Sequence, residues 1–350
     1  MKQIVKLSAE ERSILFTKVS ESTHIPLAMI EKDFWVCFVL AKIFSDTELR
    51  DALHFKGGTS LSKGYGLIKR FSEDLDLILD KSLVLGDEDI FKSSYKKQRE
   101  FADIMSEKTA TYVSTILKSK IENALGDIVK VYTDAEYAEI MPTYNPISID
   151  NKSLHIVYPK STNDVYLRPD ILLEIGIMSA RTPCEDRKIT SYVAQALPQL
   201  GLESCIVPTV KPIRTFWDKA TILHREFYRP ATKYNKQKDT EEPNHTPARY
   251  SRHYHDLYQL GNSFVKDESL ADRDLLADVI DRKDKLYHCP WAKYDECLSG
   301  KMHLLPNENN KNVIQDDYKA MQTMIYGEIP TWDEIIKYLA ELEKEINQTK

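Results

Sequence analysis

Two aspartates separated by one residue, Asp74 and Asp76, follow the string Arg-Phe-Ser-Glu at positions 70–73. Side chains on a β-strand alternate between its two faces, so a strand here would point both carboxylates one way, and Leu75 and Leu77 the other way. Neighbouring carboxylates repel each other unless a cation lies between them. Oxygen ligands suit a hard ion, so the pair predicts a magnesium site.

A glycine turn precedes this strand. Gly57 and Gly58 follow a short predicted strand, residues 54–56, and lead into a helix predicted from residue 59 to residue 69. Glycine lets the backbone come close to a bulky anion, and the first N–H groups of a helix favour phosphate. A phosphate cradle beside a metal-binding strand is the arrangement needed to transfer a nucleotidyl group.

Polar and cationic side chains surround the turn. Three cations that flank a phosphate site have a direct electrostatic use. The hydroxyl of Ser72 either hydrogen-bonds a phosphate, orients Asp74, or only stabilises a turn. The candidate nucleotide-binding residues in this region are Lys56, Gly57, Gly58, Thr59, Ser60, Lys63, Arg70 and Ser72.

On these residues the segment resembles the AbiEii/AbiGii-type nucleotidyltransferases. These are toxins of bacterial toxin–antitoxin and phage-defence operons, within the DNA polymerase beta-like nucleotidyltransferase superfamily. The resemblance rests on residues 56–61, 70–77, 216–220 and 252–258, and extends from about residue 31 to about residue 260. It implies an α/β (α+β) fold: a polymerase beta-like core with a mixed sheet, N-terminal helices and a largely helical C-terminal domain.

The resemblance also implies an activity. The family would use Mg2+ to move a nucleoside monophosphate from a nucleoside triphosphate to an acceptor hydroxyl. The implied acceptor is RNA, such as a tRNA 3′ end, and the implied outcome is inhibition of translation and growth. A cognate antitoxin would be encoded nearby, and in many such systems it need not bind the toxin. A protein or small-molecule acceptor, and a non-catalytic nucleotide- or RNA-binding protein on the same fold, are the alternatives.

A third carboxylate is predicted on a later, apolar strand, residues 165–178. Glu174 lies in the middle of it, where a lone carboxylate is costly unless a charge or a metal compensates it. By resemblance, Glu174 would be the third metal-facing carboxylate. Asp170, four residues earlier and of the same parity, is the alternative. An ion pair of Glu174 with Arg168 or Arg181 is the structural explanation.

Two later helices carry the remaining candidates. Near residue 215 an amphipathic helix begins, and Lys219 lies at the margin of its apolar face. A second helix, predicted over residues 249–260, places Arg252 and Asp256 one turn apart, with Arg249 one turn earlier. By resemblance, Lys219 contacts the nucleotide phosphates, Asp256 completes the active site, and both arginines are further phosphate-binding candidates. The plain explanation is a surface ion pair between Arg252 and Asp256, worth a few tenths of a kcal/mol.

The order of elements suggests two domains. Residues 1–210 would hold the nucleotidyltransferase core with its N-terminal helices, and residues 211–350 a helical domain that contributes phosphate-binding and active-site residues. The stretch 230–247 is predicted to be a polar linker or mobile loop. Helices are predicted at 8–20, 26–45 and 88–125, and another follows the charged stretch 185–188 and runs to about residue 197. Further strands are predicted at 128–134 and 153–159.

Composition restricts the class of protein. The formal charge of −6 argues against a uniformly basic nucleic-acid binder, although residues 211–252 hold ten Lys or Arg against five Asp or Glu. That local excess predicts either a contact surface for a polyanion or a solvated loop. Five scattered cysteines, no secretory signal and no apolar run long enough for a membrane span indicate a cytoplasmic protein with reduced thiols.

Overall fold

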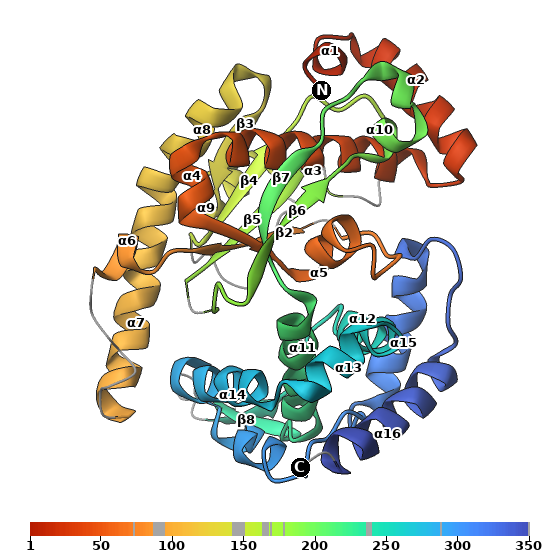
Figure 1. The fold of residues 1–350 in the computed structure, drawn as a ribbon. Coiled ribbons are helices and arrows are strands. Elements are labelled where there is room, and N and C mark those ends of the chain that lie inside the picture. Colours follow the sequence, from red (N-terminus) through yellow and green to blue (C-terminus); the bar gives the residue numbers. More distant parts are fainter. Residues whose placement is uncertain are drawn as a thin grey trace. The chain divides into compact units, whose positions relative to one another are not determined.

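The chain forms two compact units in a computed structural model (Figure 1). The first unit comprises Met1–Gly66 and Phe71–Val210, and the second comprises Leu67–Arg70 and Lys211–Lys350. The structure describes residues 1–72, 74–86, 95–141, 151–162, 168, 170–177, 179–235, 240–287 and 289–348. In these ranges, no helix combines the length and the apolar character that a membrane crossing requires.

A seven-stranded mixed sheet, in the order β3-β4-β5-β2-β1-β7-β6, is the centre of the first unit. Strand β2 runs antiparallel to β1 and parallel to β5, and β1 runs parallel to β7. The predicted mixed α/β class is therefore confirmed. The strands are β1 Leu53–Lys56, β2 Asp74–Leu79, β3 Lys130–Thr133, β4 Ser153–Val157, β5 Asp170–Gly176, β6 Cys184–Ile189 and β7 Cys205–Val210.

The first unit also contains the chain's N-terminal helices. Helix α2 begins with the predicted capping box, in which Ser8 and Glu11 exchange hydrogen bonds between side chain and backbone. The helices of the first unit are α1 Lys2–Val5, α2 Ala9–Thr23, α3 Leu27–Ser45, α4 Thr47–Ala52, α5 Gly57–Thr59, η1 Ser60–Gly64, α6 Ser82–Leu85, α7 Tyr95–Tyr112, η3 Val113–Leu117, α8 Lys118–Leu125, η4 Gly126–Ile128, α9 Asp134–Ile140, α10 Tyr192–Ala196 and η5 Pro198–Leu200.

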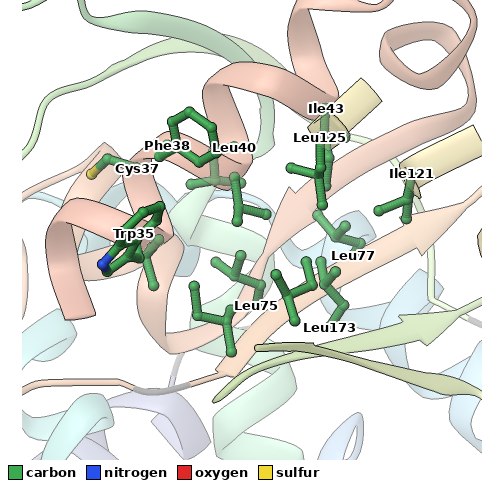
Figure 2. Close-up of a cluster of buried hydrophobic side chains, with 14 of the residues drawn as sticks. Trp35, Cys37, Phe38, Leu40, Ile43, Leu75, Leu77, Ile121, Leu125 and Leu173 are labelled. Atoms are coloured by element: carbon green, nitrogen blue, oxygen red, sulfur yellow. The ribbon is translucent and has the colours of Figure 1, made fainter. Parts of the chain in front are cut away.

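Helix α3 packs its side chains onto one face of the sheet (Figure 2). Leu75 and Leu77 of β2 point into this core and are fully buried, together with Leu173 of β5. Because side chains alternate along a strand, burying these leucines turns the intervening residues of β2 to the other face. The hydrophobic contact with α3 therefore decides which way the two aspartates point.

The second unit is helical, with one two-stranded hairpin. Its elements are α11 Pro212–Phe227, β8 Thr232–Asn235, β9 Thr240–Pro243, α12 Ser251–Gly261, α13 Val265–Ala271, α14 Arg273–Tyr287, η6 Pro290–Ala292, η7 Tyr294–Cys297, α15 Lys311–Met321, η8 Gln322–Met324 and α16 Trp332–Gln348. The segment Leu67–Arg70 joins this unit, since Arg70 forms a β-bridge with Ile325 and the N–H of Tyr326 donates to the Lys69 carbonyl at 2.9 Å.

Several predicted elements differ from the observed ones. The helix expected to reach residue 69 ends at Gly64, and the polar linker at 230–247 contains the β8–β9 hairpin, although residues 236–239 lie outside the described part. The helix predicted after the charged stretch 185–188 corresponds to α10, whereas the charged stretch itself lies in strand β6, which the sequence did not predict. This strand lies at the edge of the sheet and carries mostly polar side chains, so it lacks the apolar alternation that marks a strand. The predicted helix at 88–125 corresponds to α7, η3 and α8, and its first seven residues lie outside the described part.

Candidate active site

Asp76 lies in a row with Lys56 and Glu174 across three neighbouring strands. Lys56 on β1 is its register partner on one side, and Glu174 on β5 is its partner on the other. Register partners share a face of the sheet, and so does Asp74, two residues earlier on the same strand. Three carboxylates from β2 and β5 are therefore on the face opposite the core.

These carboxylates differ in their exposure to solvent. Asp74 and Asp76 are half-buried, whereas Glu174 is exposed. The expectation that Glu174 suffers a desolvation cost was wrong, because Ile171, Leu173 and Ile175 face the core and Glu174, between them, faces away from it. The two arginines considered as its ion-pair partners bind other carboxylates: Arg168 pairs with Asp170, and Arg181 pairs with Asp80.

Gly57 passes directly against one of the carboxylates. Its φ is +79°, and a Cβ added to it would lie 1.8 Å from Oδ2 of Asp76. A backbone angle of this kind already favours glycine, and the contact with Asp76 leaves no space for any side chain. The sequence signal of two adjacent glycines therefore marks a close approach between the turn and the carboxylate strand.

The hydroxyls of this turn bind protein backbone. Thr59 Oγ1 donates to the Asp74 carbonyl at 2.6 Å, and Ser60 Oγ donates to the Gly57 carbonyl at 2.8 Å. Both residues are buried, so their single hydroxyl protons are not available to a phosphate. This placement argues against a phosphate contact of either side chain: Thr59 ties the turn to β2, and Ser60 makes a hydrogen bond within the turn. Ser72 is half-buried, and its hydroxyl makes no hydrogen bond to the described residues, so it remains a candidate donor.

The two lysines of the motif have different surroundings. Lys56 Nζ donates to Ser179 Oγ at 2.9 Å and lies beside Asp76 in the sheet. Lys63 Nζ is 2.6 Å from Oδ1 of Asp33 on α3, and both side chains are buried. This pairing argues against a nucleotide contact of Lys63, because its charge is matched by Asp33 inside the core.

Asp170 belongs to a separate buried cluster. Its Oδ2 lies 2.7 Å from Nδ1 of His155 and 2.9 Å from a guanidinium nitrogen of Arg168, while Nε2 of His155 lies 2.9 Å from Asp134. Burial would raise the pKa of Asp170, but the contacts with His155 and Arg168 outweigh burial and lower it to about 2. A carboxylate held in this way is a poor metal ligand, so the geometry favours Glu174 as the third carboxylate.

His155 is held between two carboxylates. Burial would lower its pKa, but the hydrogen bonds with Asp134 and Asp170 outweigh burial and raise the pKa above its ordinary value. The Tyr137 ring stacks on the imidazole with the ring centroids 4.0 Å apart. The cluster thus fixes α9 against β4 and β5.

The second unit holds a buried group of three charges. Asp256 on α12 is fully buried and accepts hydrogen bonds at 2.8 Å from both Nε and a terminal nitrogen of Arg70. Lys219 on α11 places Nζ 2.7 Å from Oδ2 of the same carboxylate. Burial would raise the pKa of Asp256, but these two cations hold it well below its usual value. Burial lowers the pKa of Lys219, against the attraction of Asp256.

The neighbouring arginines are placed differently from expectation. Helix α12 begins at Ser251, and Arg249 precedes it with a left-handed φ of 59°, donating its backbone N–H to Asp317 at 2.7 Å. Arg249 therefore does not stack one turn before Arg252 as predicted. Arg252 is half-buried one turn before Asp256, whose bidentate partner is Arg70.

The expected polyanion surface is reduced by internal pairing. Arg214 pairs with Asp278, and Arg229 pairs with the buried Glu226. Lys219 pairs with Asp256. These cations belong to the run 211–252 that gave the local positive excess, so much of that charge is already compensated within the unit.

Sequence reasoning missed the acidic partners of Lys63 and His155, which are Asp33 and Asp134. Asp33 follows two other charged residues, Glu31 and Lys32, and all three are buried in the apolar helix α3. Three consecutive charges at the start of an apolar run were the available signal, since buried charges require partners. The pairing of Asp134 with His155 had no such local signal, because these residues are far apart in the sequence.

The carboxylates fit a magnesium ion. In the described ranges, no three His, Cys, Asp or Glu side chains form a ready-made metal cluster. Magnesium, however, is commonly bound by one or two carboxylates, with substrate phosphates and water completing its shell. Asp74 and Asp76 supply that pair from one strand, and the backbone of Gly57 comes close to the second of them.

The contact of Gly57 with Asp76 gives a prediction. Gly57→Ala should lower the free energy of unfolding by about 2 kcal/mol or more, because left-handed strain and a steric clash add. Gly201→Ala is the control, since Gly201 also has a positive φ but faces open space. In an Asp76→Gly background the cost of Gly57→Ala should fall by about 1 kcal/mol or more in urea denaturation. An equal cost in both backgrounds would contradict the contact.

The His155 cluster predicts a pH dependence of stability. The pKa of His155 is higher in the folded protein than in the unfolded chain, where it is near 6.5. Its contribution to the free energy of unfolding is therefore fully present below pH 6.5, and it is lost as the pH rises through the pKa of the folded protein. His155→Gln should therefore cost about 3 kcal/mol at pH 6 and less at pH 9, measured by thermal denaturation. His245→Gln, at an exposed histidine, is the control. A constant difference between pH 6 and pH 9 would exclude a charged His155.

One family model matches most of the chain. The model described as "Nucleotidyl transferase AbiEii toxin, Type IV TA system" matches residues 39–338. Among solved structures, the nucleotidyltransferase toxin MenT4 from Mycobacterium tuberculosis H37Rv is similar at 12% identity and a TM-score of 0.40, over 90% of this chain and 99% of that chain. No curated protein sequence matches the chain.

Proposed function

Because this chain belongs to the AbiEii family of nucleotidyltransferase toxins of type IV toxin–antitoxin systems, we propose that it moves a nucleoside monophosphate from a nucleoside triphosphate to RNA. A hydroxyl of the RNA, such as that of a tRNA 3′ end, is the proposed acceptor. The observation that carries this proposal is the set of carboxylates on β2 and β5 beside the Gly57 turn.

Asp74 and Asp76 are the proposed magnesium ligands, with Glu174 as the third carboxylate. When bound, magnesium neutralises triphosphate charge and lowers the pKa of the acceptor hydroxyl. Glu174 is exposed on the same face as the two aspartates, and its proposed role is to take a proton from that hydroxyl. Asp170 is the weaker candidate because His155 and Arg168 already occupy it.

The turn is the proposed site for the phosphates. Gly57 and Gly58 offer backbone without side chains, and the accessible hydroxyl of Ser72 is a possible donor. Lys56 adds positive charge on the carboxylate face, since it is the register partner of Asp76. Thr59 and Ser60 would act only by holding the turn in place.

Lys219 is proposed to neutralise charge on the transferred and leaving phosphates, as the family motif implies. Lys219 and Arg70 both pair with Asp256, so two positive charges face one negative charge. A bound phosphate would supply further negative charge. Asp256 would then act by orienting Lys219 and Arg70, and Arg252 is a further cation near the same carboxylate. Arg249, outside the helix, is the weakest of these candidates.

The biological setting follows from the family. We propose a nearby antitoxin gene, a role in phage defence and action in the cytoplasm, where five free thiols stay reduced. A nucleotide- or RNA-binding protein without catalysis is the alternative. Incubation with each labelled nucleoside triphosphate, magnesium and total RNA separates the two, since only an enzyme incorporates label into RNA.

Charge removal at the carboxylates tests the metal assignment. Asp74→Asn or Asp76→Asn should lower the transfer rate about a thousandfold, because several kcal/mol of charge stabilisation are lost. Melting temperatures should stay equal or rise slightly, since the mutual repulsion is relieved. Asp127→Asn, at an exposed site, is the control. Glu174→Gln should lose activity at saturating magnesium while Asp170→Asn, if it folds, keeps it; the reverse result would exchange their roles.

The shared carboxylate gives a separate expectation. Lys219→Met keeps the side-chain volume, so it should weaken nucleoside triphosphate binding by about tenfold, the loss of one charge-assisted contact. Binding would be measured by titration calorimetry with a non-hydrolysable triphosphate. Lys233→Met, at an exposed lysine of the hairpin, is the control. Unchanged affinity of Lys219→Met would remove Lys219 from the nucleotide site.

A further inference from the structure

The helical segment after the glycine turn is anchored from the core by one buried ion pair. Lys63 of η1 lies 2.6 Å from Asp33 of α3, with both side chains almost fully buried. The same ammonium lies 3.8 Å from the centroid of the Tyr192 ring. The backbone N–H of Tyr192 also donates to the second oxygen of Asp33 at 2.6 Å. Elements α3, η1 and α10 therefore meet at one carboxylate.

The other end of this segment contacts the carboxylate strand. Thr59 donates to the Asp74 carbonyl, and Gly57 touches the side chain of Asp76. Gly57, at a left-handed φ of +79°, leads directly into α5 and η1, which continue to residue 64. Because such a segment is stiff, a rotation at Lys63 would move Gly57 relative to Asp76.

We propose that Asp33 and Lys63 are positioning residues for the nucleotide-binding turn. Their ion pair sets the rotation of residues 57–64 and so holds Gly57 against Asp76. The inference rests on the proposed function, in that the positioned turn is the one assigned to the triphosphate. Neither residue touches the substrate in this assignment; both act through the helical segment.

The energetics of a buried pair support orientation rather than stability. Removing two charges from water costs roughly what their attraction returns, so apolar residues of similar volume often fold equally well. Burial raises the pKa of Asp33, and Lys63 acts against this rise, so each charge depends on the other. An apolar pair would not fix the orientation of the two elements, because dispersion contacts form in many relative rotations and an ion pair forms in few.

Helix α3 also offers a matched control. Glu31, two residues before Asp33, is equally buried and accepts hydrogen bonds from the backbone N–H groups of Ser161 and Thr162. Glu31→Gln thus perturbs a buried carboxylate of the same helix that anchors a different segment. Any effect of Asp33 that merely reflects damage to α3 should appear in Glu31→Gln as well.

The test compares Asp33→Asn, Lys63→Met and the double variant with Glu31→Gln. Asparagine keeps an acceptor for the Tyr192 N–H, and methionine keeps the volume of lysine, so the double variant removes only the two charges. Each single variant should lower the melting temperature, and the double variant should recover most of that loss. Hydrogen–deuterium exchange of the amides in residues 57–64 should nevertheless rise about tenfold in the double variant.

Nucleotide kinetics supply the second measurement. The double variant should raise the KM for the nucleoside triphosphate about tenfold, whereas Glu31→Gln should change it less than about twofold at temperatures well below melting. If the double variant regains both the melting temperature and wild-type exchange of residues 57–64, the pair is only structural and the proposal is overturned. If the wild-type protein transfers no nucleotide, the proposed function fails, while the exchange data still decide whether the pair positions the turn.

Discussion

The burial of Leu75 and Leu77 beneath α3 is the constraint on which the rest of the first unit depends. A strand has only two faces, and a shift by one residue would exchange them completely. Filling one face with leucine therefore gives the aspartates an orientation that their own repulsion would not select. The hydrophobic core thus holds two like charges side by side, and a cation can relieve the repulsion that remains.

The charged groups of the two units differ in their burial. On the first unit, Asp74 and Asp76 of β2 are half-buried and Glu174 of β5 is exposed, all on the face opposite the core. In the second unit, Asp256 is fully buried with Arg70 and Lys219 bound to it. Carboxylates on an accessible face can take part in binding a metal ion. The buried group instead keeps its cations in fixed positions, because neither can turn away without leaving a carboxylate unpaired.

The sequence predicted the parts of the molecule that are governed by local rules. The sequence indicated strand β2, the capping box of α2 and the glycine turn, because alternation, capping and positive φ are properties of short segments. Edge strand β6 was not recognised, because its sequence has no alternating apolar pattern. Backbone pairing with β7 holds it in the sheet. The partners of Lys63 and Asp170 were missed for a related reason. Asp33 and His155 reach them only through tertiary packing, and a side chain's type does not tell whether its charge is matched inside the protein.

The segment Leu67–Arg70 counts with the second unit although it lies between two elements of the first. A cut after Val210 would not release an intact helical half, because Asp256 would lose its bidentate arginine. A buried carboxylate deprived of such a partner destabilises a domain by roughly 3–5 kcal/mol, a large share of the stability of most domains. The two units are therefore interleaved modules, and an exchange of C-terminal halves between relatives at that point would succeed only where the donor of residues 67–70 supplies a matching arginine.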